Sequence, residues 1–266
     1  MSLAPRHHTR GVTKSRSITS MTLCIHLHNV YSVLPLPFAD RLPGAGIRHG
    51  RELRKSGSKG KSGSKGKGSS KTKTLEIAIT NLTPFQPFSP FFVMTHDASV
   101  PRLFSFGQPA SPGLQDLAEN GSPSLLVAQY TGMPGVGTAA GTTAGATGPG
   151  ATQTITVQVS EDYPYVTLGS MFVNTNDGFI AINGRYLQDG DAFFLNGYDA
   201  GTEENNQNCN SIPGPACPPG NVASGNGEGF VHVHAGFQAG IGDLPNVVGA
   251  IVDWRNPMAY VVVTEV

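Results

Sequence analysis

The chain has 266 residues and a formal net charge of zero, from 18 Lys+Arg and 18 Asp+Glu, but the two signs are separated along the sequence. Residues 1–74 hold 15 of the basic residues and two acids, whereas residues 75–266 hold three Arg and 16 acids. The 34 Gly and 20 Pro, with only 14% charged residues, exclude a helical bundle or a coiled coil. We expect one folded, all-β domain at residues 75–266 behind a disordered basic arm at residues 1–74.

The basic arm contains two distinctive segments. Residues 21–39 are mainly apolar and follow Lys14 and Arg16, an order typical of a targeting segment, although two His and one Asn dilute it. Residues 56–71 repeat Ser, Gly and Lys, and in composition they resemble the silica-associated peptides called silaffins. This repeat predicts either a polycation for anionic polysaccharide, silica, membrane or nucleic acid, or a solvated linker. No apolar run is long enough to predict a transmembrane segment.

Short runs of β-branched residues after Thr74 predict strands. Leu75, Ile77 and Ile79 alternate with polar residues, as do Ile155, Val157 and Val159, and this period of two is typical of half-buried strands. Further strands are expected at residues 166–173, 179–187, 192–198, 230–237, 247–254 and 258–266. Within the second of these, Asn183-Gly184 predicts a two-residue hairpin turn. Strands of this number and length favour an antiparallel β-sandwich.

One short helical insertion interrupts the strands. Ser111-Pro112 can begin a helix, residues 114, 117 and 118 form its apolar face, and Gly121 can end it. Ser122-Pro123 begins the same pattern again. Residues 132–151 contain Gly, Ala, Thr and Pro without a charge, which predicts a mobile surface loop.

Cys209 and Cys217 bracket a short polar loop, while Cys24 lies in the arm. We expect a disulfide between Cys209 and Cys217, which would indicate an oxidising compartment. The alternative is a pair of free surface thiols. Asn81 and Asn120 begin acceptor sequences for N-glycosylation.

Several motifs occur in a telling order: ITNLTPFQPFSPFFVMTHD (79–97), LFSFGQPASPGLQDLAENG (103–121), NTNDGFIAINGRYL (174–187), YDAGTEEN (198–205), GEGFVHVHAGF (227–237) and DWRNPMAYVVV (253–263). In this order they strongly resemble the spondin domain, over essentially all of residues 75–266. The resemblance implies a sandwich similar to a C2 domain, extracellular or cell-surface location, a role in matrix adhesion, and no catalysis.

The resemblance also implies a calcium site at one edge of the sandwich. Carried over by position, its acidic ligands fall on Asp177 and Asp199, and a third ligand, a Glu in the family, falls on Gln158. Gln retains a carbonyl oxygen but lacks the charge, so weaker Ca²⁺ binding is expected, unless Glu203 and Glu204 compensate. From the residues alone, both Asp side chains could instead accept backbone N–H bonds in turns.

The pair His232 and His234 presents two imidazoles to one face of a strand. With His96 they could hold Cu, Fe or Zn in a small metal-dependent oxidoreductase; alternatively they bond to local loops, for example through Asp97, Asp253 or Glu228.

The leading hypothesis is a secreted, non-catalytic domain that binds matrix, a cell-surface protein or, through its arm, anionic polysaccharide or silica. Nucleic-acid binding by the arm is the third hypothesis, and the acidic domain argues against it.

Overall fold

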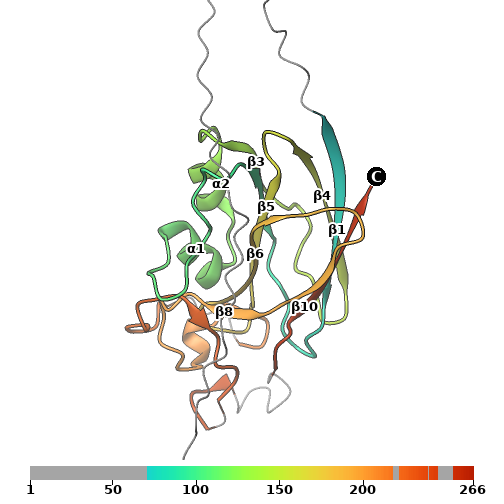
Figure 1. The fold of residues 1–266 in the computed structure, drawn as a ribbon. Helices are drawn as coiled ribbons and strands as arrows, with labels where there is room; N and C mark the ends of the chain where they lie inside the picture. Colours follow the sequence, from blue (N-terminus) through green and yellow to red (C-terminus); the bar gives the residue numbers. More distant parts are fainter. Residues whose placement is uncertain (1–70, 218–221, 239, 245–253) are drawn as a thin grey trace, which may run out of the picture. The chain divides into compact units, whose positions relative to one another are not determined.

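The computed structural model describes residues 71–217, 222–238, 240–244 and 254–266, which belong to one compact unit. These residues form two antiparallel sheets and two α-helices, α1 (Pro112–Asn120) and α2 (Ser124–Tyr130), as Figure 1 shows. The predicted all-β sandwich with a short helical insertion is therefore confirmed. The targeting segment at residues 21–39 and the repeat at 56–71, except Lys71, lie outside the described residues. No helix in the described ranges has the length and apolarity needed to cross a bilayer.

The first sheet has four strands in the order β4 (Thr152–Ser160), β1 (Thr72–Asn81), β10 (Ala259–Glu265) and β7 (Ala192–Leu195). Ile77 on β1 lies between Ile155 on β4 and Val263 on β10, so the predicted alternation places one apolar face inward. Strand β1 begins earlier than the predicted boundary at residue 75, because Thr72 to Thr74 pair with the end of β4.

The second sheet has six strands in the order β3 (Val136–Gly141), β2 (Phe92–His96), β5 (Tyr165–Met171), β6 (Gly178–Tyr186), β8 (Gly197–Asp199) and β9 (His232–Val233). The strand predicted at residues 192–198 is divided, because the chain leaves the first sheet after Leu195 and joins the second at Gly197. The strand predicted at 230–237 is only two residues long, and the one predicted at 247–254 lies, except Trp254, outside the described residues.

One local prediction was wrong in part and another was wrong altogether. The expected mobile loop at residues 132–151 contains β3. The small residues of this strand allow the Tyr163 ring to approach its backbone closely, since a Cβ on Gly137 would lie 2.7 Å from that ring. Asn183-Gly184 does not form a hairpin turn, because β6 continues through it. The pairing of β6 with β5 shifts at this point, and Gly184 adopts a φ of 67° in a β-bulge. Thr167 Oγ1 accepts the Gly184 N–H at 2.8 Å and secures the bulge.

The helices cover the outer face of the second sheet, beside β5 and β6 and away from β1 and β10 (Figure 1). Ser111 Oγ accepts the Leu114 N–H, and Gly121 ends α1 with a φ of 66°, so both predicted boundaries are confirmed. Leu114, Leu117 and Ala118 are buried against the sheet in one apolar cluster, while a second cluster fills the space between the sheets. A fully buried Leu contributes about 2 kcal/mol through the area it removes from water.

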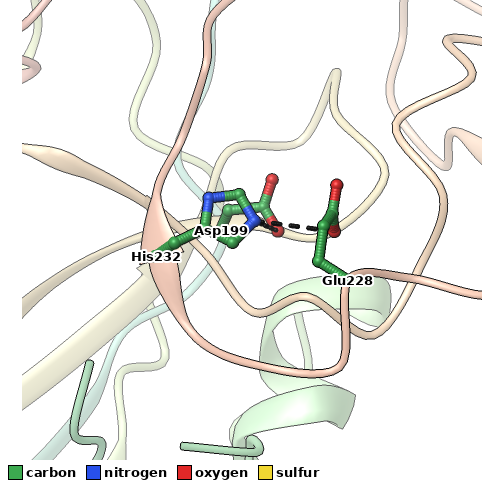
Figure 2. A group of neighbouring side chains, drawn as sticks. All are labelled: Asp199, Glu228 and His232. Carbon is green, nitrogen blue, oxygen red and sulfur yellow. Dashed lines mark ion pairs between the residues drawn. The ribbon is translucent and has the colours of Figure 1, made fainter. Parts of the chain in front are cut away.

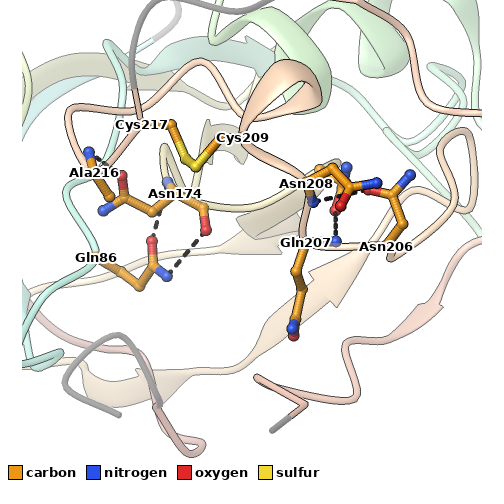
Figure 3. The surroundings of a disulfide bond; sticks show 9 residues. Gln86, Asn174, Asn206, Gln207, Asn208, Cys209, Ala216 and Cys217 are labelled. Carbon is orange, nitrogen blue, oxygen red and sulfur yellow. Dashed lines mark hydrogen bonds between the residues drawn. A yellow bond between two sulfur atoms is a disulfide. The ribbon is translucent and has the colours of Figure 1, made fainter. Parts of the chain in front are cut away.

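The predicted disulfide between Cys209 and Cys217 is present, with 5.1 Å between the Cα atoms. It is buried beside Ile212 and Leu244 rather than at the surface. Figure 3 shows how this loop is attached to the sandwich: Asn174 Oδ1 accepts the Ala216 N–H at 3.1 Å, and Gln86 Oε1 accepts the Asn174 N–H at 3.1 Å.

Candidate metal centre

A cluster of acidic and histidine side chains lies where β6, β8 and β9 are adjacent. Gly178 pairs with Asp199 and Asp199 pairs with His232, so the register of three strands brings Asp177, Asp199 and His232 to one end of the sheet. Both Asp side chains are fully buried. The loop before β9 supplies Glu228, and the residue after β9 supplies His234.

The turn after β8 holds both aspartates in place. Gly201 has a φ of 67°, and a Cβ on it would lie 2.2 Å from the Phe230 carbonyl oxygen, so this position requires glycine. Asp199 Oδ1 accepts the Gly201 N–H at 2.8 Å. Asp177 Oδ2 accepts the N–H groups of Thr202 at 2.6 Å and Glu203 at 3.1 Å. Both Asp side chains therefore accept backbone N–H bonds in this turn, as the alternative interpretation expected.

The two histidines have different tautomers, because their Nδ1 atoms have different partners. His232 Nδ1 lies 2.9 Å from the Val233 carbonyl oxygen and must donate to it, so in the neutral ring Nε2 carries a lone pair. His234 Nδ1 accepts the Gly236 N–H at 3.0 Å, so its Nε2 carries the proton and points toward Asp199 Oδ2, 3.8 Å away. His232 can thus ligate a metal through Nε2, whereas His234 Nε2–H faces the Asp199 carboxylate without a hydrogen bond to it.

His232 Nε2 faces two carboxylates (Figure 2). It lies 3.4 Å from Asp199 Oδ1 and 3.5 Å from Glu228 Oε2, is itself buried, and makes no hydrogen bond. A lone pair between two carboxylates is repulsive unless a proton or a metal cation lies among them. One ligand atom from each of Asp199, Glu228 and His232 lies within 4.8 Å of the others, close to the separation of about 3–4 Å that ligands of one small divalent ion adopt.

Burial controls the protonation of the surrounding groups. Burial and the nearby Asp199 charge raise the pKa of Asp177 to about 8, and burial raises the pKa of Glu203 to about 7. Burial lowers the pKa of His234. Burial also opposes the charged form of His232, but the Val233 carbonyl and the carboxylates of Asp199 and Glu228 raise its pKa overall. Burial therefore favours the neutral forms of Asp177, Glu203 and His234, whereas the carboxylates of Asp199 and Glu228 favour a positive charge at His232.

Only part of the calcium site predicted from the resemblance is assembled. Gln158 is exposed on β4, in the other sheet, because it alternates with the inward-facing Val157 and Val159. Its assignment as a ligand beside Asp177 and Asp199 was wrong. Of the two acids expected to compensate, Glu203 is buried beside Asp177 and Glu204 is exposed.

His96 does not join the histidine pair either. Its Nδ1 lies 2.7 Å from the Asp97 carbonyl oxygen and its Nε2 lies 2.9 Å from Thr167 Oγ1, so both ring nitrogens have partners. In the sheet order, β2 is four strand positions from β9, a separation of about 19 Å. The proposed ligand set of three histidines was therefore wrong.

The two glycosylation sequences differ in exposure. Asn81 is fully buried; its Nδ2 donates to the carbonyls of Gln86 and Thr147, and its Oδ1 accepts from Thr83. A glycan on Asn81 is incompatible with this fold. Asn120 is exposed at the end of α1, and its modification stays a prediction.

Sequence reasoning placed Glu228 beside the histidines only as a hydrogen-bonding alternative and missed Asn205. Asn205 Nδ2 donates to Asp199 Oδ2 at 2.8 Å and to Glu228 Oε1 at 3.2 Å, so it joins the two carboxylates. The position of Glu228, four residues before His232, could have indicated that it is a ligand. No sequence pattern indicates that Asn205 joins the carboxylates of Asp199 and Glu228.

Comparison of the chain with models of protein families and with curated proteins gives no match. The assignment of function therefore depends on the geometry described above and on the order of the sequence motifs.

Proposed function

We propose that this chain is a secreted, non-catalytic binding domain whose loops at one end of the sandwich are held by a divalent metal ion. The observation that carries the proposal is the buried lone pair of His232 Nε2, which faces the carboxylates of Asp199 and Glu228 without a hydrogen bond. Two segments meet there, the end of β8 with Asp199 and the chain from Glu228 to His232, so an ion at this point would fix the loop before β9 to β8.

The donor atoms favour a transition metal over calcium. Calcium prefers six to eight oxygen ligands, whereas one imidazole nitrogen and two carboxylates suit Zn²⁺, Mn²⁺ or Fe²⁺. Asn205, which donates to the Asp199 and Glu228 carboxylates, supplies the outer hydrogen bonds that such ligands commonly have. The ion would accept the lone pair of His232 Nε2 and balance the negative charges of the two carboxylates.

The surroundings favour a structural ion over a catalytic one. The hollow beside His234, bordered by Asn205 and Trp254, has a volume of about 20 Å³, which is room for about one water molecule. The His234 tautomer also leaves the site one nitrogen ligand fewer than the oxidoreductase hypothesis requires. Secretion is supported by the buried Cys209–Cys217 disulfide, a bond that is rare in reducing compartments, and by the spondin-like motifs.

Thermal unfolding of the full chain in a chelator and with Zn²⁺, Mn²⁺ or Ca²⁺ tests the metal site. We expect Zn²⁺ or Mn²⁺ to raise the midpoint of the wild type, with about 2.7 kcal/mol of stabilisation at a metal concentration 100 times Kd. His232→Gln and Glu228→Gln should abolish the increase. Glu76→Gln, which removes an exposed acid from the outer face of β1, is the matched control and should retain it.

Two outcomes would contradict the proposal. If no divalent ion changes the wild-type midpoint, the lone pair of His232 is neutralised by a proton and the centre holds no metal. If Ca²⁺ alone raises the midpoint and His232→Gln responds equally, the ion lies elsewhere. Secretion is tested separately: free Cys209 and Cys217 thiols in a protein recovered only from the cytosol would exclude it.

A further inference from the structure

Three hollows follow one another along the end of β6 that is remote from the metal centre. An end pocket of about 390 Å³ lies between the sheets and has Leu75, Val159 and Leu187 among its apolar lining residues. A side groove of about 600 Å³ runs past β6 and β7, and a small hollow of about 150 Å³ lies beside His96. Tyr186 borders both the end pocket and the side groove, and Arg102 and Gly184 border both the side groove and the small hollow. The three hollows are therefore neighbours, and together they are called the track.

Most of the Lys and Arg residues described in the acidic folded domain line the track. The described residues contain five Lys and Arg, and acids outnumber them about three to one. Four of the five line the track, namely Lys71, Lys73, Arg102 and Arg185. No Asp or Glu lines the side groove. Two acids line the end pocket: Glu265, which is paired with Lys73, and Glu161. Beside the small hollow, Asp97 accepts bonds from Ser99.

The two arginines are held in defined positions. Arg102 Nη1 donates to the backbone carbonyls of Asn183 and Gly184, at the β6 bulge. The Arg185 guanidinium lies over the Phe193 ring, 3.7 Å from its centroid. A guanidinium fixed in this way loses little side-chain entropy when it binds a carboxylate or sulfate through two N–H groups.

Aromatic surface accompanies the charge. Tyr186 is 58% exposed at the junction of the end pocket and the side groove. An exposed aromatic ring of this kind presents an apolar face with a polar tip, which suits the C–H face and hydroxyl groups of a sugar ring. The track is elongated, and its cations are spaced along it rather than gathered in one pocket, so it suits a linear polymer better than a compact ligand.

We propose that this track binds an anionic polysaccharide, with carboxylate or sulfate groups on Arg102 and Arg185 and a sugar ring against Tyr186. The proposal rests on the proposed secreted binding function and names its ligand class. Charge complementarity selects this occupant, because four of the five cations described in the folded domain line one track. A nucleic acid is the competing polyanion, and single-stranded DNA is compared with the polysaccharide in the test below.

Binding of a defined alginate oligosaccharide to the full chain tests the proposal, with a neutral cello-oligosaccharide of equal length as the control ligand. Because the basic arm also attracts polyanions, titrations are made at about 0.1 M and 0.3 M salt, where screening reduces the contribution of the arm. We expect Arg185→Gln and Tyr186→Ala each to weaken binding five-fold or more at the higher salt. Arg255→Gln, which removes the same charge away from the track, should bind as the wild type does.

Equal affinities of wild type, Arg185→Gln and Arg255→Gln would overturn the proposal and assign polymer binding to the arm. Single-stranded DNA that binds as tightly as alginate, with the same dependence on Arg185, would overturn the choice of polysaccharide. The Zn²⁺-dependent midpoint of each variant is measured in parallel. A variant that keeps this increase is folded, so loss of polymer binding then concerns the track alone and leaves the metal proposal intact.

Discussion

Glu203 is a buried carboxyl group whose protonation should control the stability of the loop after β8. It is 3% exposed; Oε1 accepts the Ser224 N–H at 2.8 Å, and Oε2 is buried without a hydrogen bond. Burial, with a smaller contribution from the Glu119 charge, raises its pKa to about 7. Glu203→Gln preserves the shape and the accepting oxygen but removes the charge, so it imitates the protonated native state.

The sign of the effect follows from the proton balance. Below pH 4.5, the ordinary value, both folded and unfolded Glu203 are protonated and the group contributes its full stability. Between pH 4.5 and about 7 only the folded state keeps the proton, so the free energy of unfolding falls as pH rises. At 1.36 kcal/mol per pH unit, the loss is on the order of 3 kcal/mol. The glutamine variant escapes this loss, so it should exceed the wild type in stability by a margin that grows to about 2–3 kcal/mol at pH 8.

Urea unfolding of both proteins between pH 4.5 and 8, with chelator throughout, measures this margin. Asp177, which burial and the Asp199 charge also shift to a higher pKa, and His234 titrate in both proteins, so their effects largely cancel in the difference. Glu204→Gln, at the exposed neighbouring position, is the matched control and should follow the wild-type curve. A wild-type curve parallel to that of Glu203→Gln would refute the reasoning, because it would show that Glu203 is charged in the folded state at neutral pH.

Two further predictions concern the loops of the same region. Gly201→Ala should destabilise the domain by more than 3 kcal/mol, because its Cβ would collide with the Phe230 backbone, whereas Gly190→Ala, at a similar positive φ with open space around it, should cost only about 1 kcal/mol. Urea unfolding of the two variants measures how much the contact between residue 201 and the Phe230 backbone matters. Equal losses of unfolding free energy in both variants would contradict this explanation. Replacing both Cys209 and Cys217 by Ser should remove about 2–3 kcal/mol, as expected for a short closed loop. A reductant should weaken the wild type to the level of this variant and leave the variant itself unchanged; if the reductant has no effect on the wild type, the bond contributes no stability.

The sandwich and its helical insertion were predictable because each depends on a local pattern. The alternation around Ile77 and Ile155 fixes which face of β1 and β4 is buried, and Ser111-Pro112 with Gly121 determines where α1 begins and ends. Strand β3 was missed because Gly and Ala give no alternating signal, although their small size is what allows the close approach of Tyr163. Asn183-Gly184 was misassigned because a positive φ at Gly184 serves a bulge as well as a hairpin turn, and only pairing with β5 decides between them.

Two ligands of the candidate metal centre were predictable singly, but the complete set was not. Asp199 and His232 were identified, yet their contact depends on the register between β8 and β9. Gln158 was included by correspondence of motifs, and only the sheet order shows that it lies on the other sheet. The choice between His232 and His234 as a ligand depends on which backbone group meets each Nδ1, and the sequence contains no information about that.

The two proposed sites lie at opposite ends of β6, and this separation keeps the carboxylates of one site away from the polyanion bound at the other. Gly178, at one end of the strand, is next to the carboxylates of Asp177 and Asp199, and Tyr186, at the other end, borders the cationic track. Eight residue steps span about 26 Å, several times the Debye length of about 8 Å at physiological salt. Screening over this distance lets a polyanion bind at the track without repulsion from the acidic cluster, and it leaves the metal with no electrostatic influence on the polymer. Occupancy of the metal centre should therefore stabilise the fold without changing polysaccharide affinity, and a several-fold change in that affinity on adding Zn²⁺ would show that the two sites are coupled through the strand itself.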